Sequence, residues 1–153
     1  MDVHLRSANM DEIDQIADLW VDLAHHQEKF GSNLRAQSNR TRIRESFSRR
    51  ALADELLVAT EGDEIVGFAS ISLEHRLFDV VKSRGIIENL YVLPRSRGNG
   101  IGGELLNEAE TRLGKRGADI ICLEALKGNL TARDFYERHG FSVHRVEYTK
   151  SIR

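Results

Sequence analysis

The sequence contains little of what defines several large protein classes. Its one cysteine, Cys122, excludes an intrachain disulfide framework and is typical of a reducing compartment. No apolar run reaches the roughly 18 residues that a membrane-spanning helix needs, and the polar, acidic N-terminus is unlike a secretory signal. We therefore expect a cytoplasmic protein with no membrane partner. Because Cys122 lies in an apolar run, we expect it to be a buried structural thiol.

An excess of one charge is also absent. The chain carries 22 basic and 24 acidic residues, a net charge of −2, which gives no sign of a nucleic-acid partner. Pro94 is the only proline, and there is no repeat or linker, so the length predicts a single domain over residues 1–153. The histidines show no metal-ligand spacing, and His25 and His26, adjacent on a predicted helix, point apart. We expect no metal site.

Hydrophobic periodicity predicts an order of strands and helices. Residues 3–6 form an opening strand, and a capping box of Asn9 and Glu12 starts a helix that ends near Glu28. The other expected elements are a helix from Ser38 or Asn39, strands over 56–60 and 65–73 joined by a turn at 61–64, a polar loop over 74–84, a strand over 85–93, a helix over 101–115, a buried strand over 120–125, a helix over 129–139 and a strand over 141–148. The upstream hairpins are antiparallel, whereas the later strand–helix–strand unit requires a parallel pair. This order predicts an α/β (α+β) fold with a mixed, mostly antiparallel sheet flanked by helices.

A glycine-rich junction joins the strand over 85–93 to the helix that follows. Arg95 and Arg97 precede Gly98-Asn99-Gly100-Ile101-Gly102-Gly103, which opens an amphipathic helix. The first amides of a helix have no partner within it, the helix dipole favours an anion there, and glycines let the backbone approach a ligand. We therefore expect this junction to hold a phosphate group.

The same six residues match the dinucleotide-binding pattern G-x-G-x-x-G, and Glu124 follows near the place of a ribose-binding acid. The context disagrees with that interpretation. Residues 94–97 separate the strand from the first glycine, antiparallel hairpins precede the motif, and only about one further strand–helix unit remains. A Walker-type loop fits less well, because no Gly-Lys-Ser/Thr follows.

Two blocks together resemble the GNAT (GCN5-related) family of acetyl-CoA-dependent N-acetyltransferases. The first is Leu90-Tyr91-Val92-Leu93-Pro94 followed by Arg95-x-x-Gly98-x-Gly100, which is similar to the acetyl-CoA signature of the family. The second is Asn129-x-x-Ala132-x-x-Phe135-Tyr136-Glu137-x-x-Gly140-Phe141, which is similar to its distal helix. The likeness covers about residues 56–141. It implies a GNAT fold whose sheet splays between the strands over 85–93 and 120–125.

The resemblance also implies where acetyl-CoA, the co-substrate, would bind. Its pyrophosphate would lie on the amides of residues 98–103, and its pantetheine arm would pair with the open strand edge as an added strand does. Asn129 would hold the arm, unless it serves only as a helix N-cap. The implied cofactor-binding residues are Leu90, Tyr91, Val92, Arg95, Arg97, Gly98, Asn99, Gly100, Ile101, Gly102, Gly103, Asn129 and Tyr136. Arg95 and Arg97 either contact phosphate or solvate the loop.

The implied reaction is direct transfer of the acetyl group to a primary amine. Such amines, with a pKa near about 10.4, are mostly protonated at neutral pH, so a base must remove a proton. Glu124 is the first candidate, because its Leu-Glu-Ala setting resembles that of family members that acetylate N-terminal amines; Glu88 is the second, and either could act through water. A backbone amide at 90–92 would polarise the thioester, and Tyr136 would protonate the departing thiolate. Structural alternatives remain, since Glu124 could cap backbone amides and Tyr136 could be a core residue.

The acceptor cannot be read from the sequence. A protein N-terminus, a lysine side chain and a small-molecule amine all remain candidates. Arginines concentrated over residues 35–50 are typical of a solvated face, although in this family the region borders the acceptor, which makes an acidic acceptor a hypothesis. Few residues follow Phe141, so the last strand is single or completed by another subunit, which favours a homodimer. The alternative to an enzyme is a catalytically silent acyl-CoA-binding module; Tyr136, Asn129 and a cleft glutamate favour the enzyme.

Overall fold

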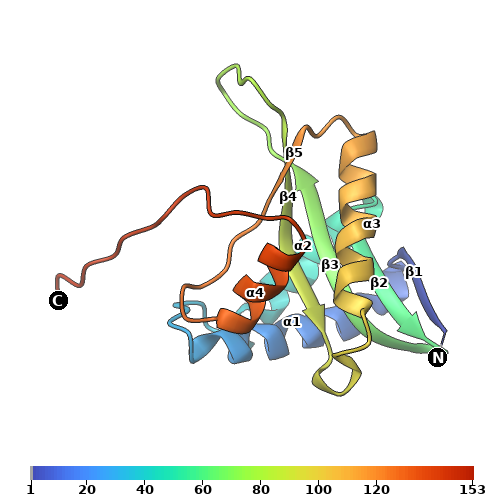
Figure 1. Ribbon diagram of the computed structural model, residues 1–153. Coiled ribbons are helices and arrows are strands. Elements are labelled where there is room, and N and C mark those ends of the chain that lie inside the picture. The colour runs from blue at the N-terminus through green and yellow to red at the C-terminus, as the bar shows by residue number, and fades with distance from the viewer. Residues whose placement is uncertain (1) are drawn as a thin grey trace.

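The computed structural model describes residues 2–153, and its centre is a five-stranded sheet in the order β1-β2-β3-β4-β5 (Figure 1). The strands are β1 (Val3–Ser7), β2 (Leu56–Glu61), β3 (Glu64–Leu73), β4 (Arg84–Val92) and β5 (Ile120–Cys122). The first four pair antiparallel and β5 runs parallel to β4, which confirms the mixed sheet. The helices are α1 (Ile13–Glu28), α2 (Arg40–Leu52), α3 (Ile101–Lys115) and α4 (Leu130–Arg138). Short 3-10 turns precede α1, α2 and α3.

Helices cover both faces of the sheet and make two hydrophobic cores. Helices α1 and α2 pack on one face, where Phe47 of α2 and Phe68 of β3 are fully buried and meet edge to face. Helix α3 packs on the other face with Leu105, Leu106 and Leu113 buried, and Phe135 of α4 packs against the same core. The sheet therefore separates an α1–α2 side from an α3–α4 side (Figure 1).

Local signals placed the first helix correctly. Glu12 accepts a hydrogen bond from the Asn9 amide at 2.8 Å, which is the reciprocal half of a capping box, and α1 ends at Glu28 as expected. The apolar residues that recur at helical spacing along α1 are all buried: Ile13, Ile16, Ala17, Trp20, Leu23 and Ala24. Helix α2 differs slightly, because Asn39 occupies the N-cap position but its side chain donates to the Arg35 carbonyl instead.

The predicted splay of the sheet is confirmed by the pairing of its last two strands. Only Arg84 to Ile86 pair with β5, so the remainder of β4 has no neighbour on that side. A β-bulge lies in the same stretch, because Ser70 faces Asn89 while Ile71 faces Ile87, which leaves Glu88 as the extra residue. The bulge and the loss of pairing together open one edge of β4 from residue 87 to residue 92.

Three expectations for the last part of the chain are wrong. Strand β5 stops at Cys122 rather than residue 125, and its residues, Cys122 included, are half-buried rather than buried. Residues 141–148 form no strand; this segment runs away from the sheet (Figure 1). A strand needs a partner along most of its length, and the three residues of β5 offer too short an edge. The apolar residues of the segment also change face between Val143 and Val146, which breaks the two-residue period.

The connection between β3 and β4 is also less polar than expected. Leu77, Phe78 and Val81 are respectively 92%, 77% and 99% exposed at its tip, where no other element covers them. Within residues 2–153, no helix is both long and apolar enough to cross a membrane.

The close approach of β3 to β4 predicts that Gly67 is required for stability. A Cβ at this position would lie 2.8 Å from the Tyr91 carbonyl oxygen and 3.2 Å from Leu105 Cδ1. We expect Gly67→Ala to lower the free energy of unfolding by about 1–3 kcal/mol, because backbone atoms must shift to accept it. Urea unfolding followed by circular dichroism measures the change.

Gly114→Ala is the matched control, because a Cβ at this α3 position meets nothing within 4 Å. In a helix, alanine in place of glycine stabilises by up to about 1 kcal/mol. Equal stability of the two variants would show that the β3–β4 approach is not tight.

Candidate functional site

The start of α3 is an open helix N-terminus. Gly100 occupies the N-cap position with φ +80°, and Gly98 has φ +83°, a backbone conformation that favours glycine. No side chain caps the helix. Among the described residues, none of the amides of residues 98–103 donates to a backbone carbonyl. Unpaired amides at the positive end of a helix dipole can bind an anion such as a phosphate group.

The four glycines of this loop serve two purposes. A Cβ on Gly98 or Gly100 would meet nothing within 4 Å, so these two are needed for their backbone conformation. A Cβ on Gly102 would lie 3.3 Å from Phe135 Cζ, and one on Gly103 would lie 3.0 Å from His139 Nε2. These two glycines therefore let α4 pack closely against the start of α3.

The two arginines before the loop have different surroundings. Arg97 Nε donates to the Val92 carbonyl at 2.9 Å, and the guanidinium lies 5.4 Å from the centre of the Tyr91 ring. Arg95 instead forms an ion pair with Glu64 at the start of β3. Of the two, only Arg97 is placed between the open strand edge and the glycine loop. Asn99 donates within the loop to the Ser96 carbonyl at 3.3 Å.

The open edge of β4 presents the peptide groups of two residues. The Leu93 amide donates to the Val66 carbonyl at 2.8 Å, and the Tyr91 carbonyl also faces β3. In an antiparallel strand alternate residues point their peptide groups to opposite sides, so those of Leu90 and Val92 face away from β3. The predicted donor and acceptor groups for an added chain therefore belong to Leu90 and Val92, and Tyr91 contributes a buried side chain.

Helix α4 holds the second predicted block. The Tyr136 ring makes edge contacts with Phe135 and Phe141, at centroid distances of 5.5 and 6.0 Å. Burial raises the pKa of the Tyr136 phenol above its usual value, so the hydroxyl stays protonated and able to donate. The Asn129 side-chain oxygen accepts a hydrogen bond from the Ala132 amide at 3.2 Å, so Asn129 is the N-cap of α4.

The structure separates the two candidate glutamates. Glu88 lies at the bulge of β4 on the α2 side, where Arg50 forms an ion pair with it and the Ser72 hydroxyl donates to it at 2.5 Å. Glu124 is exposed on the loop after β5 and, in residues 2–153, makes no hydrogen bond or ion pair. The alternative in which Glu124 caps backbone amides is therefore not seen.

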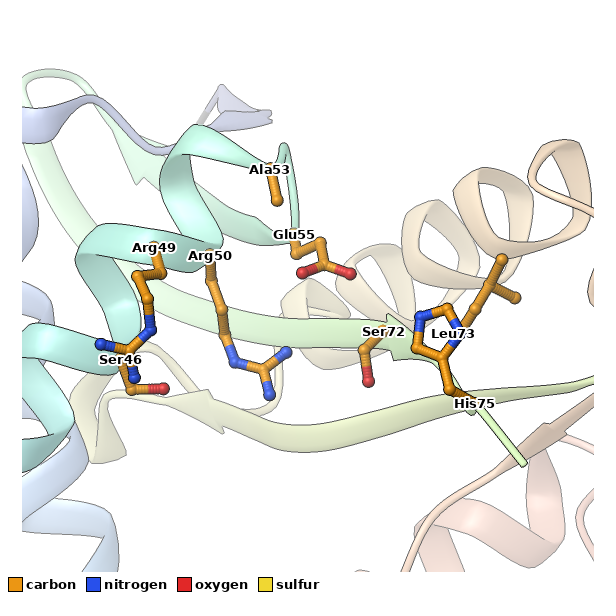
Figure 2. Close-up of a pocket in the computed structure, with 8 residues that line it drawn as sticks. All are labelled: Ser46, Arg49, Arg50, Ala53, Glu55, Ser72, Leu73 and His75. Atoms are coloured by element: carbon orange, nitrogen blue, oxygen red, sulfur yellow. The ribbon is translucent and has the colours of Figure 1, made fainter. Parts of the chain in front are cut away.

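A hollow of about 430 Å³ adjoins the glutamate at the bulge (Figure 2). Arg50 and Ser72, the two partners of Glu88, both line it, together with Arg49 and His75. The arginines of this region are apparent in the sequence, but the contact of Arg50 with Glu88 on β4 is not. The signal was weak, because the two partners are 38 positions apart in the chain.

Known proteins resemble this chain in sequence and in fold. Residues 20–141 match the model of the acetyltransferase (GNAT) family. An uncharacterised N-acetyltransferase, YhfO of Bacillus subtilis, is 33% identical over 88 residues, 56% of this chain and 57% of that protein. The aminoalkylphosphonate N-acetyltransferase of Salmonella typhimurium is 32% identical over 95 residues, 62% and 61% of the two chains.

The chain thus aligns with less than two thirds of the length of each of these relatives. A crystal structure of a predicted acetyltransferase with acetyl-CoA from Clostridium acetobutylicum shares the fold, with a TM-score of 0.75 and 22% identity over 99% of this chain and 97% of that one. The family match covers most of the chain and both blocks of the site, and the chain belongs to the GNAT acetyltransferase family.

Proposed function

We propose that this protein is an N-acetyltransferase that moves the acetyl group of acetyl-CoA directly to a primary amine. The observation that carries the proposal is the position of Gly102, at the uncapped start of α3. It lies against both Val92 on the open edge of β4 and Phe135 of α4, the neighbour of Tyr136. Membership of the GNAT family supports it, and so does the relative whose name assigns it an aminoalkylphosphonate, which is an amine.

The residues around the glycine loop fit two parts of acetyl-CoA, the pyrophosphate and the pantetheine arm. Amides of residues 98–103 would hold the pyrophosphate, and the peptide groups of Leu90 and Val92 would pair with the amides of the pantetheine arm. Arg97 now donates to the Val92 carbonyl, so pairing through that carbonyl requires the guanidinium to turn toward the phosphates. An amide of Leu90 or Val92 would also stabilise negative charge on the thioester oxygen.

The reaction requires the removal of a proton from the amine and the donation of a proton to the departing sulfur. The amine nitrogen attacks the carbonyl carbon of the thioester, the carbon–sulfur bond breaks, and the sulfur leaves as a thiolate. Glu88, directly or through water, accepts the proton that the amine loses, and the Tyr136 hydroxyl gives a proton to the thiolate. We favour Glu88 over Glu124 because Arg50 and Ser72 fix the Glu88 side chain just beyond the last residue of β4 that pairs with β5. Glu124, in contrast, is exposed and has no side-chain partner among the described residues.

The first prediction concerns the role of Tyr136. We expect Tyr136→Phe to lower kcat roughly 10- to 100-fold, because the general acid is lost. The measurement is the release of free thiol from acetyl-CoA with a panel of primary amines. The Kd for acetyl-CoA, measured by calorimetry, should change little, because the loop amides and the peptide groups of Leu90 and Val92 supply most of the proposed contacts.

Tyr148→Phe serves as the control, because that side chain is 91% exposed and lies outside the site. Unchanged turnover in Tyr136→Phe would remove Tyr136 from the mechanism. Acetyl-CoA binding with no thiol release from any amine would favour a silent binding module, and the proposal fails altogether if acetyl-CoA does not bind.

The second prediction separates the glutamates. Glutamine keeps the size and the hydrogen-bonding oxygen of glutamate but cannot accept the proton. We expect Glu88→Gln to lower kcat at neutral pH by roughly 100-fold, with part of the loss recovered at alkaline pH, where more of the amine is already deprotonated. Glu124→Gln should change kcat less than about twofold, since nothing fixes this side chain. The reverse order of effects would assign the base to Glu124.

The third prediction concerns the pH at which the two buried tyrosines ionise and its effect on stability. Burial raises the pKa of both Tyr136 and Tyr91 above the usual value near 10.0. The stability that these neutral phenols contribute is therefore complete below about pH 10 and is lost as the pH rises through their folded-state pKa. Ultraviolet titration should show that Tyr136→Phe removes a phenol that ionises above pH 10; removal of one that ionises below 10 would contradict its burial.

A further inference from the structure

The hollow beside Glu88 lies on the α1–α2 side of the sheet, opposite the side on which α3 packs. Figure 2 shows Arg49 and Ser46 of α2 at one end, His75 and Leu73 at the other, and Arg50 between them. Its volume of about 430 Å³ lies within the range, roughly 300–1,000 Å³, of pockets that bind small molecules. The hollow is thus large enough for a small ligand that enters from the side away from α3.

Most of the arginines on α2 are engaged in ion pairs within the protein. Arg40 donates to Asp18 at 2.7 Å and Arg44 to Asp14 at 2.6 Å, so both tie α2 to α1. Arg50 is engaged by Glu88. The basic face predicted from the sequence is therefore much less positive than its residue count indicates.

Arg49 is different, because it lines the hollow and, across residues 2–153, forms no ion pair or side-chain hydrogen bond. Glu55, the carboxylate in the lining of the hollow, lies 3.8 Å from Arg116, and Glu88 beside the hollow pairs with Arg50. The hollow is left with one uncompensated guanidinium, the His75 imidazole and the Ser46 hydroxyl. These groups together are suited to an anionic oxygen group, because a guanidinium binds carboxylates and phosphonates through paired hydrogen bonds.

The hollow is also connected to the position of the reaction. Arg50 and Ser72 line it and hold Glu88, the proposed base, at the bulge of β4. Leu90, the nearer of the two residues whose amides would face the thioester, is two strand residues further on, a span of about 7 Å. An amine placed at Glu88 would therefore be close to the acetyl group, and the remainder of the same molecule would extend into the hollow.

We propose that this hollow is the acceptor subsite and that it selects small amines carrying a carboxylate or phosphonate, with Arg49 as the residue that binds the anionic group. The inference rests on the proposed function, since it takes Glu88 as the place where the amine is deprotonated. It goes beyond that function in naming the acceptor class and the residue that determines it.

The test compares matched acceptors in the wild-type protein and in Arg49→Gln. β-Alanine carries a carboxylate where β-alaninamide carries a neutral amide, and aminoethylphosphonate supplies the second anionic group. The wild type should use β-alanine and aminoethylphosphonate with a KM at least about tenfold below that of β-alaninamide. In Arg49→Gln this preference should disappear through a higher KM for the anionic acceptors, with kcat nearly unchanged and β-alaninamide unaffected.

Arg42→Gln is the matched control, because Arg42 lies two turns earlier on α2, outside the hollow, and its side chain contacts Asn39 at 3.4 Å. This variant should keep the preference for anionic acceptors. Equal use of β-alanine and β-alaninamide by the wild type, or the same preference in Arg49→Gln, would overturn the inference, as would preferential acetylation of peptide N-termini regardless of charge.

A binding measurement without acetyl-CoA keeps this inference distinct from the proposed function. Titration of β-alanine into isotope-labelled protein should shift the backbone NMR signals of Ser46, Arg49 and His75, and Arg49→Gln should abolish the shifts. These shifts without thiol release would support the subsite and contradict the N-acetyltransferase proposal. Thiol release from neutral amines without these shifts would support the N-acetyltransferase proposal and contradict the subsite.

Discussion

The arrangement of the whole site depends on how briefly β4 pairs with β5. Hydrogen bonding between them covers three residues of each strand and ends at Ile86. Beyond that point, in the described residues, Leu90 and Val92 have no strand partner across the edge, where only Arg97 donates to the Val92 carbonyl, and β3 holds the other side. An unpaired strand edge normally allows another chain to add to it. This edge runs toward the uncapped start of α3, so backbone groups can contribute to binding both an extended ligand and its phosphate.

The bulge at Glu88 gives the same strand its second role. Regular alternation in β4 would place residue 88 on the face opposite Ile87 and put Asn89 back on the α3 side. The extra residue instead leaves Glu88 and Asn89 both on the α2 side, where Asn89 donates to the Ser70 hydroxyl and Glu88 meets Arg50. One irregularity therefore brings a carboxylate to the α2 side of the sheet without disturbing the open edge of β4.

The sequence predicted what local patterns determine. Periodicity, a capping box and turn residues give the order of elements as far as α4, and the strand–helix–strand unit gives the parallel pair that splays. Features that depend on a distant partner were not predictable. The strand expected at 141–148 lacks a neighbouring edge, β5 ends where β4 leaves it, and Arg50 reaches Glu88 across 38 positions. The glycine pattern likewise could not separate Gly100, needed for its φ, from Gly103, needed for α4.

The two cores of the fold divide the proposed chemistry between the faces of the sheet. The glycine loop and Tyr136 are supported by the core under α3 and α4, whereas Arg50 and Arg49 stand on α2, which packs on the other face. Strand β4 contacts both sets, because Val92 lies near Gly102 and Glu88 pairs with Arg50. Changes on α2 can therefore alter which amine is bound while the groups that hold the acetyl donor keep their positions. In such an arrangement the donor site is fixed by backbone, and the acceptor is selected by side chains that a few substitutions can replace.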